Sequence, residues 1–90
     1  NLNGTLPTEL GQLSSLCILN FSENSFSGSI PTELGRLTLL FELSLNMNHL
    51  NGTLPTELGL LTFLGWLSLA NNSFTGTLPT ELGEMSYLAT

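Results

Sequence analysis

Four glutamates recur at a constant spacing, and they are the first residues whose type and position could do chemistry. Glu9 has equivalents every 24 residues along the chain, at Glu33, Glu57 and Glu81. Stacked carboxylates could hold a cation or act as an acid–base pair. However, the chain contains no Asp, its single His lies elsewhere, and nothing distinguishes an acid from a base among identical copies. We therefore assign the column to the repeating scaffold and predict no cofactor and no metal site.

The remaining reactive side chains form no constellation. Cys17 is the only cysteine, so it has no intramolecular disulfide partner, and we interpret it as a small, partly buried core residue. His49 stands alone at a turn position that Ser occupies in two other units, which favours a surface residue. Zinc-ligand spacings, nucleophile elbows and glycine-rich phosphate loops are missing. The sequence therefore predicts that this segment is not an enzyme.

The charge of the chain narrows the classes of partner. Seven Glu face a single basic residue, Arg36, and the formal net charge is −6. Nucleic-acid backbones and anionic membrane surfaces require clustered Lys and Arg, so neither is an expected partner. No apolar run of about 18 residues could span a bilayer. An acidic surface suits both solubility and cationic partners, and composition does not choose between them.

The scaffold itself is a repeat of 24 residues. The octapeptide Gly-Thr-Leu-Pro-Thr-Glu-Leu-Gly begins at Gly4 and returns almost unchanged at Gly28, Gly52 and Gly76. Such a period indicates a stacked array of about 3.75 units, which we divide into 1–15 (partial), 16–39, 40–63, 64–87 and 88–90 (the start of the next). We expect further repeats on both sides in a longer parent chain. An isolated segment with uncapped apolar ends should be marginally stable or associate end to end.

Each unit contains the block Leu-x-x-Leu-x-(Leu/Phe)-x-x-Asn, which begins at Leu16, Leu40 and Leu64. Its alternating apolar positions predict a short strand with one buried face, and stacked copies form a parallel sheet. Asn carries an acceptor and two donors, so it can satisfy backbone groups where the chain turns inward. We predict a structural ladder formed by Asn24, Asn48 and Asn72.

The second half of each unit returns the chain to the next strand. One large apolar residue per unit should form a core spine, at Phe26, Leu50 and Phe74, with Leu2 in the partial unit. The stretch Thr-Glu-Leu-Gly predicts a short helical turn with Glu near its positive end and a Thr hydroxyl at its start. Its glycine suits a left-handed C-terminal residue, at Gly11, Gly35, Gly59 and Gly83. A return to the core follows at Leu13, Leu37, Leu61 and Met85.

The full pattern L-x-x-L-x-L-x-x-N-x-(L/F)-x-G-x-(L/I)-P-x-x-L-G-x-L resembles the plant-type leucine-rich repeat over essentially the whole chain. The resemblance implies an α/β fold: a right-handed, curved solenoid, or horseshoe, with a concave parallel sheet and short helical or 3-10 turns on the convex side. It also implies a second short strand at Gly-x-(Leu/Ile)-Pro. Such arrays look like the ectodomains of receptor-like kinases and receptor-like proteins. The resemblance therefore implies an extracellular or cell-surface location and a protein or peptide ligand.

Recognition should depend on positions that differ between units on the open face of the predicted strand. Trp66 is the most informative, because an exposed Trp offers a large apolar area and an N–H donor, as interface anchors do. A Trp covered by its neighbours or exposed without a partner is the alternative. Glu42 makes the face acidic, for which a solvated surface is the simpler explanation. The candidate ligand-binding residues are Trp66, Glu42, Ile18, Asn20, Ser44, Ser68, Asn46 and Met47.

Four sequons could accept N-linked glycans in a secretory context, at Asn3, Asn20, Asn51 and Asn71. A glycan on Asn20 would block the predicted ligand face. Two alternative functions stay open. The solenoid alone could be a soluble inhibitor or scaffold protein. Its columns of Ser and Thr could instead order water, as in an ice- or surface-binding solenoid, although turns and helix starts explain these hydroxyls more simply.

Overall fold

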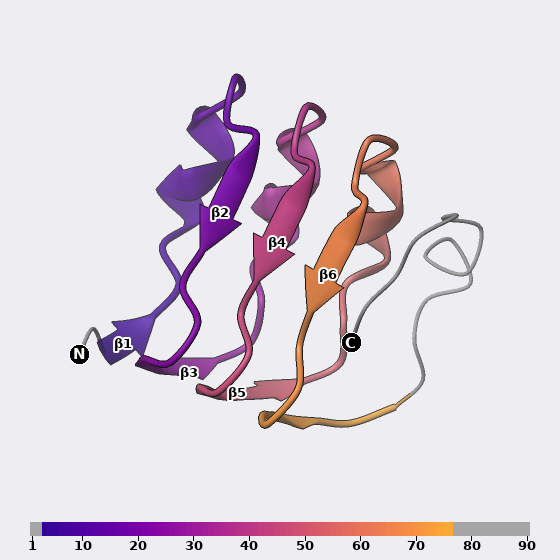
Figure 1. Cartoon of the computed structure of the whole chain (residues 1–90). Coiled ribbons are helices and arrows are strands. Elements are labelled where there is room, and N and C mark those ends of the chain that lie inside the picture. Colours follow the sequence, from indigo (N-terminus) through magenta and orange to yellow (C-terminus); the bar gives the residue numbers. More distant parts are fainter. Residues whose placement is uncertain (1–2, 77–90) are drawn as a thin grey trace.

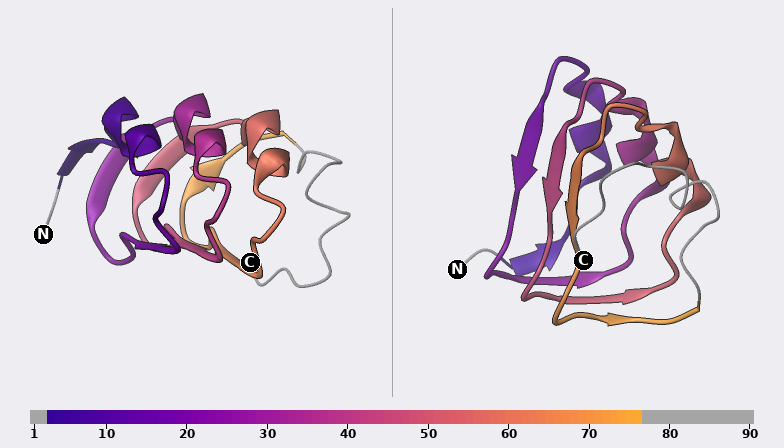
Figure 2. Two further views of the ribbon diagram at one scale, coloured as in Figure 1. Left: turned by 90° about the horizontal axis from the view of Figure 1, so that it is seen from above. Right: turned by 45° about the vertical axis from the view of Figure 1, so that its right-hand side comes forward.

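The computed structural model describes residues 3–76, which form a solenoid of stacked coils (Figure 1). Each complete coil runs through a strand, a second strand and a 3-10 helix, so the array is three-sided when viewed obliquely (Figure 2). The elements in chain order are β1 (Asn3–Thr5), η1 (Thr8–Gln12), β2 (Ile18–Asn20), β3 (Ser25–Gly28), η2 (Thr32–Arg36), β4 (Glu42–Ser44), β5 (His49–Gly52), η3 (Thr56–Leu60), β6 (Trp66–Ser68) and β7 (Ser73–Phe74).

Strands β2, β4 and β6 form a parallel sheet in the register that the sequence predicts. Ile18 pairs with Glu42 and Glu42 pairs with Trp66, so equivalent residues of successive repeats lie side by side. The ladder continues past the strand ends, where the Phe21 N–H donates to the Ser44 carbonyl at 2.8 Å. This sheet and the short 3-10 turns confirm the predicted solenoid.

The second sheet, in the order β1-β3-β5-β7, has a different register. Ser27 lies opposite His49, which is 22 positions further on and not 24. The resemblance placed the second strand at Gly-x-(Leu/Ile)-Pro, but β3 and β5 begin earlier and end at its first residue. Gly28 and Gly52 have φ angles of 78° and 79°. Such positive φ angles favour glycine, which explains the residue type at the last position of each of these two strands.

The 3-10 helices begin differently from the prediction. Pro7, Pro31 and Pro55 occupy the N-cap positions, and no side-chain hydrogen bond caps any of these three helices. The expectation that Thr hydroxyls cap the helix starts is therefore wrong. Proline performs this role because its φ is already restricted and its missing N–H would have no partner in the first turn. The predicted Glu is in the first turn of all three helices.

The glycines that close these helices are not left-handed, contrary to the prediction. Within residues 3–76, positive φ at glycine occurs only at Gly4, Gly28, Gly52 and Gly76. Gly11 and Gly35 are needed for space. A Cβ on Gly35 would lie 2.7 Å from the carbonyl oxygen of Glu57 in the next coil, and one on Gly11 would lie 2.6 Å from that of Glu33. Glycine therefore allows successive helices to approach closely. Gly83 lies outside the described residues.

The core is a column of leucines between the two sheets and the helices. Leu37, Leu43 and Leu61 are fully buried, and so is the spine residue Leu50. Phe26 is buried as well, with its ring centroid 5.2 Å from that of Phe21. Phe74 is half-buried and packs against this cluster. The core residues predicted at Leu2 and Met85 lie outside the described residues.

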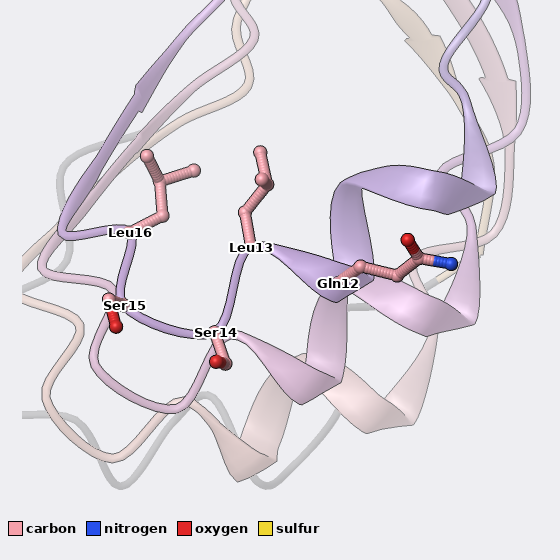
Figure 3. A pocket seen from close by; sticks show the side chains of 5 residues that line it. All are labelled: Gln12, Leu13, Ser14, Ser15 and Leu16. Carbon is pink, nitrogen blue, oxygen red and sulfur yellow. The ribbon is translucent and has the colours of Figure 1, made fainter.

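Leu13 departs from the predicted return to the core, because it lies in the first described coil. It is 50% exposed, whereas its equivalents Leu37 and Leu61 are fully buried. Figure 3 shows Leu13 and Leu16 pointing into the space between helix and strand at this end of the array. This hollow is the uncovered end of the core, since no described coil packs against it.

Candidate functional site

Asn48 makes hydrogen bonds to backbone groups of two coils. Its Nδ2 donates to the carbonyls of Phe21 (2.9 Å), Leu45 (3.0 Å) and Asn46 (3.3 Å). Its Oδ1 accepts from the N–H of buried Phe26 at 3.0 Å. Asn72 repeats the pattern one coil further, where its Oδ1 accepts from the Leu50 N–H at 3.0 Å.

Asn24 donates to the carbonyls of Phe21 and Ser22, both at 3.0 Å. Each ladder Asn thus satisfies backbone groups at the point where the strand turns inward. These side chains are therefore occupied by the scaffold.

The candidate ligand-binding residues of β2, β4 and β6 lie side by side in this sheet, whose strands Figure 1 labels, and Asn46 and Met47 follow the end of β4 in the chain. Ile18, Trp66 and Met47 are the exposed large apolar members, at 56%, 48% and 48%. Asn20 is exposed, whereas Glu42, Asn46 and Ser68 are half-buried. Ser44 is only 5% exposed, and its hydroxyl donates to Glu42 Oε2 at 3.2 Å. Ser44 can therefore orient Glu42 but offers little surface of its own.

Three residues at the lower rim of this face have left-handed backbones, which the sequence reasoning missed. Their φ angles are 58° at Glu23, 61° at Met47 and 60° at Asn71. Non-glycine residues adopt this conformation at a cost of about 1–2 kcal/mol, and Asn tolerates it best. The recurrence at one repeat position shows that the inward turn requires it. Of the three residues, only Asn71 is of a type that indicates a left-handed conformation from the sequence.

The sequence reasoning also missed an apolar edge above the strands. Leu39, Phe41 and Phe63 lie in the loops that lead into β4 and β6, and they are 45%, 57% and 63% exposed. The equivalents of Leu39 and Phe41 in the first coil are the smaller Ser15 and Cys17. The sequence does show that these positions differ from unit to unit. They lie just before the predicted strands, however, and the sequence reasoning considered only the strands and the residues after them.

The sequons differ in their surroundings. Asn3 in β1 and Asn51 in β5 are exposed on the second sheet, and Asn71 is exposed at the rim of the β2–β4–β6 face. Asn20 Oδ1 accepts hydrogen bonds from the Ser22 N–H at 3.1 Å and the Ser22 hydroxyl at 2.7 Å. Its amide is therefore held locally on the β2–β4–β6 face.

The reactive side chains stay dispersed. Within residues 3–76, no group of three His, Cys, Asp or Glu could hold a metal ion. Cys17 is exposed, so its predicted partial burial is wrong; it lies in the loop before β2, outside the core. His49 is exposed on β5. None of the helices in residues 3–76 has the length and hydropathy needed to cross a bilayer.

Comparisons with solved structures agree with this geometry. The chain is 48% identical to PEPR1 in its complex with AtPEP1, with a TM-score of 0.94 over 99% of this chain. It is 43% identical to the plant peptide hormone receptor RGFR1 in complex with RGF2, with a TM-score of 0.91 over 96% of this chain. A plant ice-binding protein is 34% identical, with a TM-score of 0.87 over 98% of this chain. The chain spans 12%, 14% and 31% of these proteins, respectively.

No match was found among curated proteins. The family profile described as Leucine Rich Repeat matches residues 15–37 and 63–85, which together make up just over half of the chain. The first segment contains β2, β3 and η2, and the second contains β6 and β7. The repeat register, the parallel sheet and this match show that the chain is a member of the leucine-rich repeat family, a non-catalytic repeat module.

Proposed function

We propose that this chain is a protein- or peptide-binding module, and that it forms part of the ectodomain of an extracellular, membrane-attached receptor-like protein or kinase. One observation carries the proposal: the repeated residues are used by the scaffold, whereas the exposed residues of the β2–β4–β6 face change from coil to coil. The column Ile18, Glu42 and Trp66 is the clearest case. The similarity to the plant peptide hormone receptor RGFR1 in complex with RGF2 supports it, as does the similarity to PEPR1 in its complex with AtPEP1.

Trp66 is the expected anchor of this face. It is 48% exposed, so burial under a ligand would remove a substantial part of its apolar area from water. Truncation of such an anchor costs about 2 kcal/mol or more, which is roughly a 30-fold loss of affinity.

The test is selection of displayed random dodecapeptides on the 90-residue chain, followed by calorimetry of the enriched peptides. We expect peptides with a Kd of about 10 μM or tighter, whose binding falls at least tenfold with Trp66→Ala. His49→Ala, on the other sheet, is the matched control and should leave the Kd unchanged. Failure to enrich any peptide, or equal binding by Trp66→Ala, would refute the proposal.

A second candidate function follows from the outer face of the other sheet. Exposed Thr5, Ser27, Asn51 and Ser73 give it a polar surface, and one similar structure is a plant ice-binding protein. An ice-binding chain would produce thermal hysteresis, which a nanolitre osmometer measures directly. Zero hysteresis at millimolar protein would remove this alternative. A soluble inhibitor or scaffold differs from a receptor in its flanking sequence, where a membrane span and a kinase signature would support the receptor.

A further inference from the structure

Phe41, Glu42, Gly65 and Trp66 form one small surface where β4 and β6 begin. The N–H groups of Gly65 and Trp66 both donate to the Phe41 carbonyl, at 2.8 and 3.1 Å. Glu42 pairs with Trp66 in the sheet. Phe41 and Trp66 are 57% and 48% exposed, and Glu42 is half-buried beside them. We call this set the Phe41–Trp66 subsite.

Gly65 gives this subsite its shape. Gly65 is not among the glycines of positive φ, so its backbone does not require glycine. A Cβ at this position would lie 2.7 Å from Phe41 Cε1 and 3.0 Å from Phe41 Cζ. The ring of Phe41 therefore lies against Gly65 of the next coil, in space that a side chain would otherwise fill. In the preceding pair of coils, Cys17 stands in the place of Phe41 and Phe41 in the place of Gly65, so among the described coils a ring packed on a glycine occurs only in the Phe41–Gly65 pair.

The charged groups beside this apolar surface are all negative. Ser44, which is nearly buried, donates to Glu42 Oε2 at 3.2 Å and so orients the carboxylate of the residue that pairs with Trp66. Glu23 adds a second exposed carboxylate at the rim of this face. The single basic residue, Arg36, belongs to η2 on another side of the coil. A cationic group is therefore attracted here, and an acidic one is repelled.

We propose that the Phe41–Trp66 subsite binds a Lys or Arg side chain of an extended peptide, with an adjacent apolar side chain of that peptide against Phe41. The cation lies over the Trp66 indole and within reach of the Glu42 carboxylate, which combines a cation–π contact with an ion pair. The apolar neighbour covers the Phe41 ring where it rests on Gly65. This inference rests on the peptide-binding function proposed above and specifies the chemistry of its ligand.

The test uses the dodecapeptides enriched on the 90-residue chain. We expect Lys or Arg next to a Leu, Ile, Phe or Tyr in the enriched sequences, and a loss of about fivefold in affinity when that cation is replaced by norleucine. Glu42→Gln should lower the affinity by about two- to fivefold, and less at high salt. Glu57→Gln removes one charge on η3 and is the matched control, with no change expected.

Gly65→Ala tests the shape of the subsite without altering Trp66 or Glu42. Its Cβ displaces the exposed Phe41 ring, so peptide affinity should fall by about threefold or more while the circular dichroism melt stays within a few degrees of the parent. Leu60→Ala, a truncation of an exposed side chain on η3, controls for general surface effects. Peptides that bind and depend on Trp66, but lack a cation or ignore Glu42→Gln and Gly65→Ala, would overturn this inference and leave the binding function standing.

Discussion

Asn48→Ala should destabilise the fold strongly, and the structure indicates which lost contact matters. The change removes three donated hydrogen bonds and one accepted bond. The Leu45 carbonyl keeps a donor, Asn72 Nδ2 at 2.9 Å, and the Phe21 carbonyl keeps Asn24 Nδ2 at 3.0 Å. The buried Phe26 N–H, in contrast, loses the Asn48 oxygen that it donates to.

The magnitude follows from this distinction. An orphaned buried N–H costs about 1–3 kcal/mol, and the loss of donors to carbonyls that keep a partner adds about 1 kcal/mol. We therefore expect Asn48→Ala to lower the free energy of unfolding by about 2–4 kcal/mol. A small domain has only about 5–15 kcal/mol in total, so much of its stability would be lost.

The assay is urea unfolding of the 90-residue chain, followed by far-ultraviolet circular dichroism with a reducing agent present because Cys17 is exposed. Asn46→Ala is the matched control. It removes the same atoms two residues earlier, from a half-buried side chain on the β2–β4–β6 face. If Asn48→Ala is unfolded in water, both variants are refolded with trimethylamine N-oxide and compared there. Equal midpoints for the two variants would refute the ladder argument.

Three further predictions concern the scaffold and its surface. Gly35→Ala places a Cβ against a backbone carbonyl of the next coil, so we expect about 1–3 kcal/mol of destabilisation in urea melts; an unchanged midpoint would contradict this close packing. Leu37→Ala should cost about 2–5 kcal/mol and Leu13→Ala less than half as much, because only the first is fully buried. In secretory expression, mass spectrometry should find a glycan on exposed Asn51 more often than on Asn20, whose side chain is hydrogen-bonded to Ser22; the reverse order would refute this reasoning.

Much of the architecture could be predicted from the period. Alternating Leu43, in β4, and Leu45, just after it, predict side chains that point into the core, and both are fully buried. Equal spacing predicts that Ile18, Glu42 and Trp66 stack, as they do in the sheet. These features depend on local alternation and on copies of equal length, which a sequence displays directly.

The errors share a different physical origin. A glycine at position 35 is typical of a left-handed helix cap. Glycine is needed there, however, because the backbone of Glu57 in the next coil leaves no room for a Cβ. Cys17 was expected to be partly buried, yet it lies in an exposed loop before β2. The importance of Phe41 and Gly65 depends on a contact between residues 24 positions apart. Contacts of this kind depend on the distance between coils, which no single repeat specifies.

The sequence by itself determined the family, the parallel stacking, the leucine core and the column that contains Trp66, because the repeat dictates which side chains must be buried together. Only the tertiary structure decided the two-residue offset of the second sheet, the near burial of Ser44 and the apolar surface that Phe41 forms on Gly65. The reason is that these features arise from packing between neighbouring coils. A periodic pattern sets the order of the coils, and their side chains then decide how closely they approach.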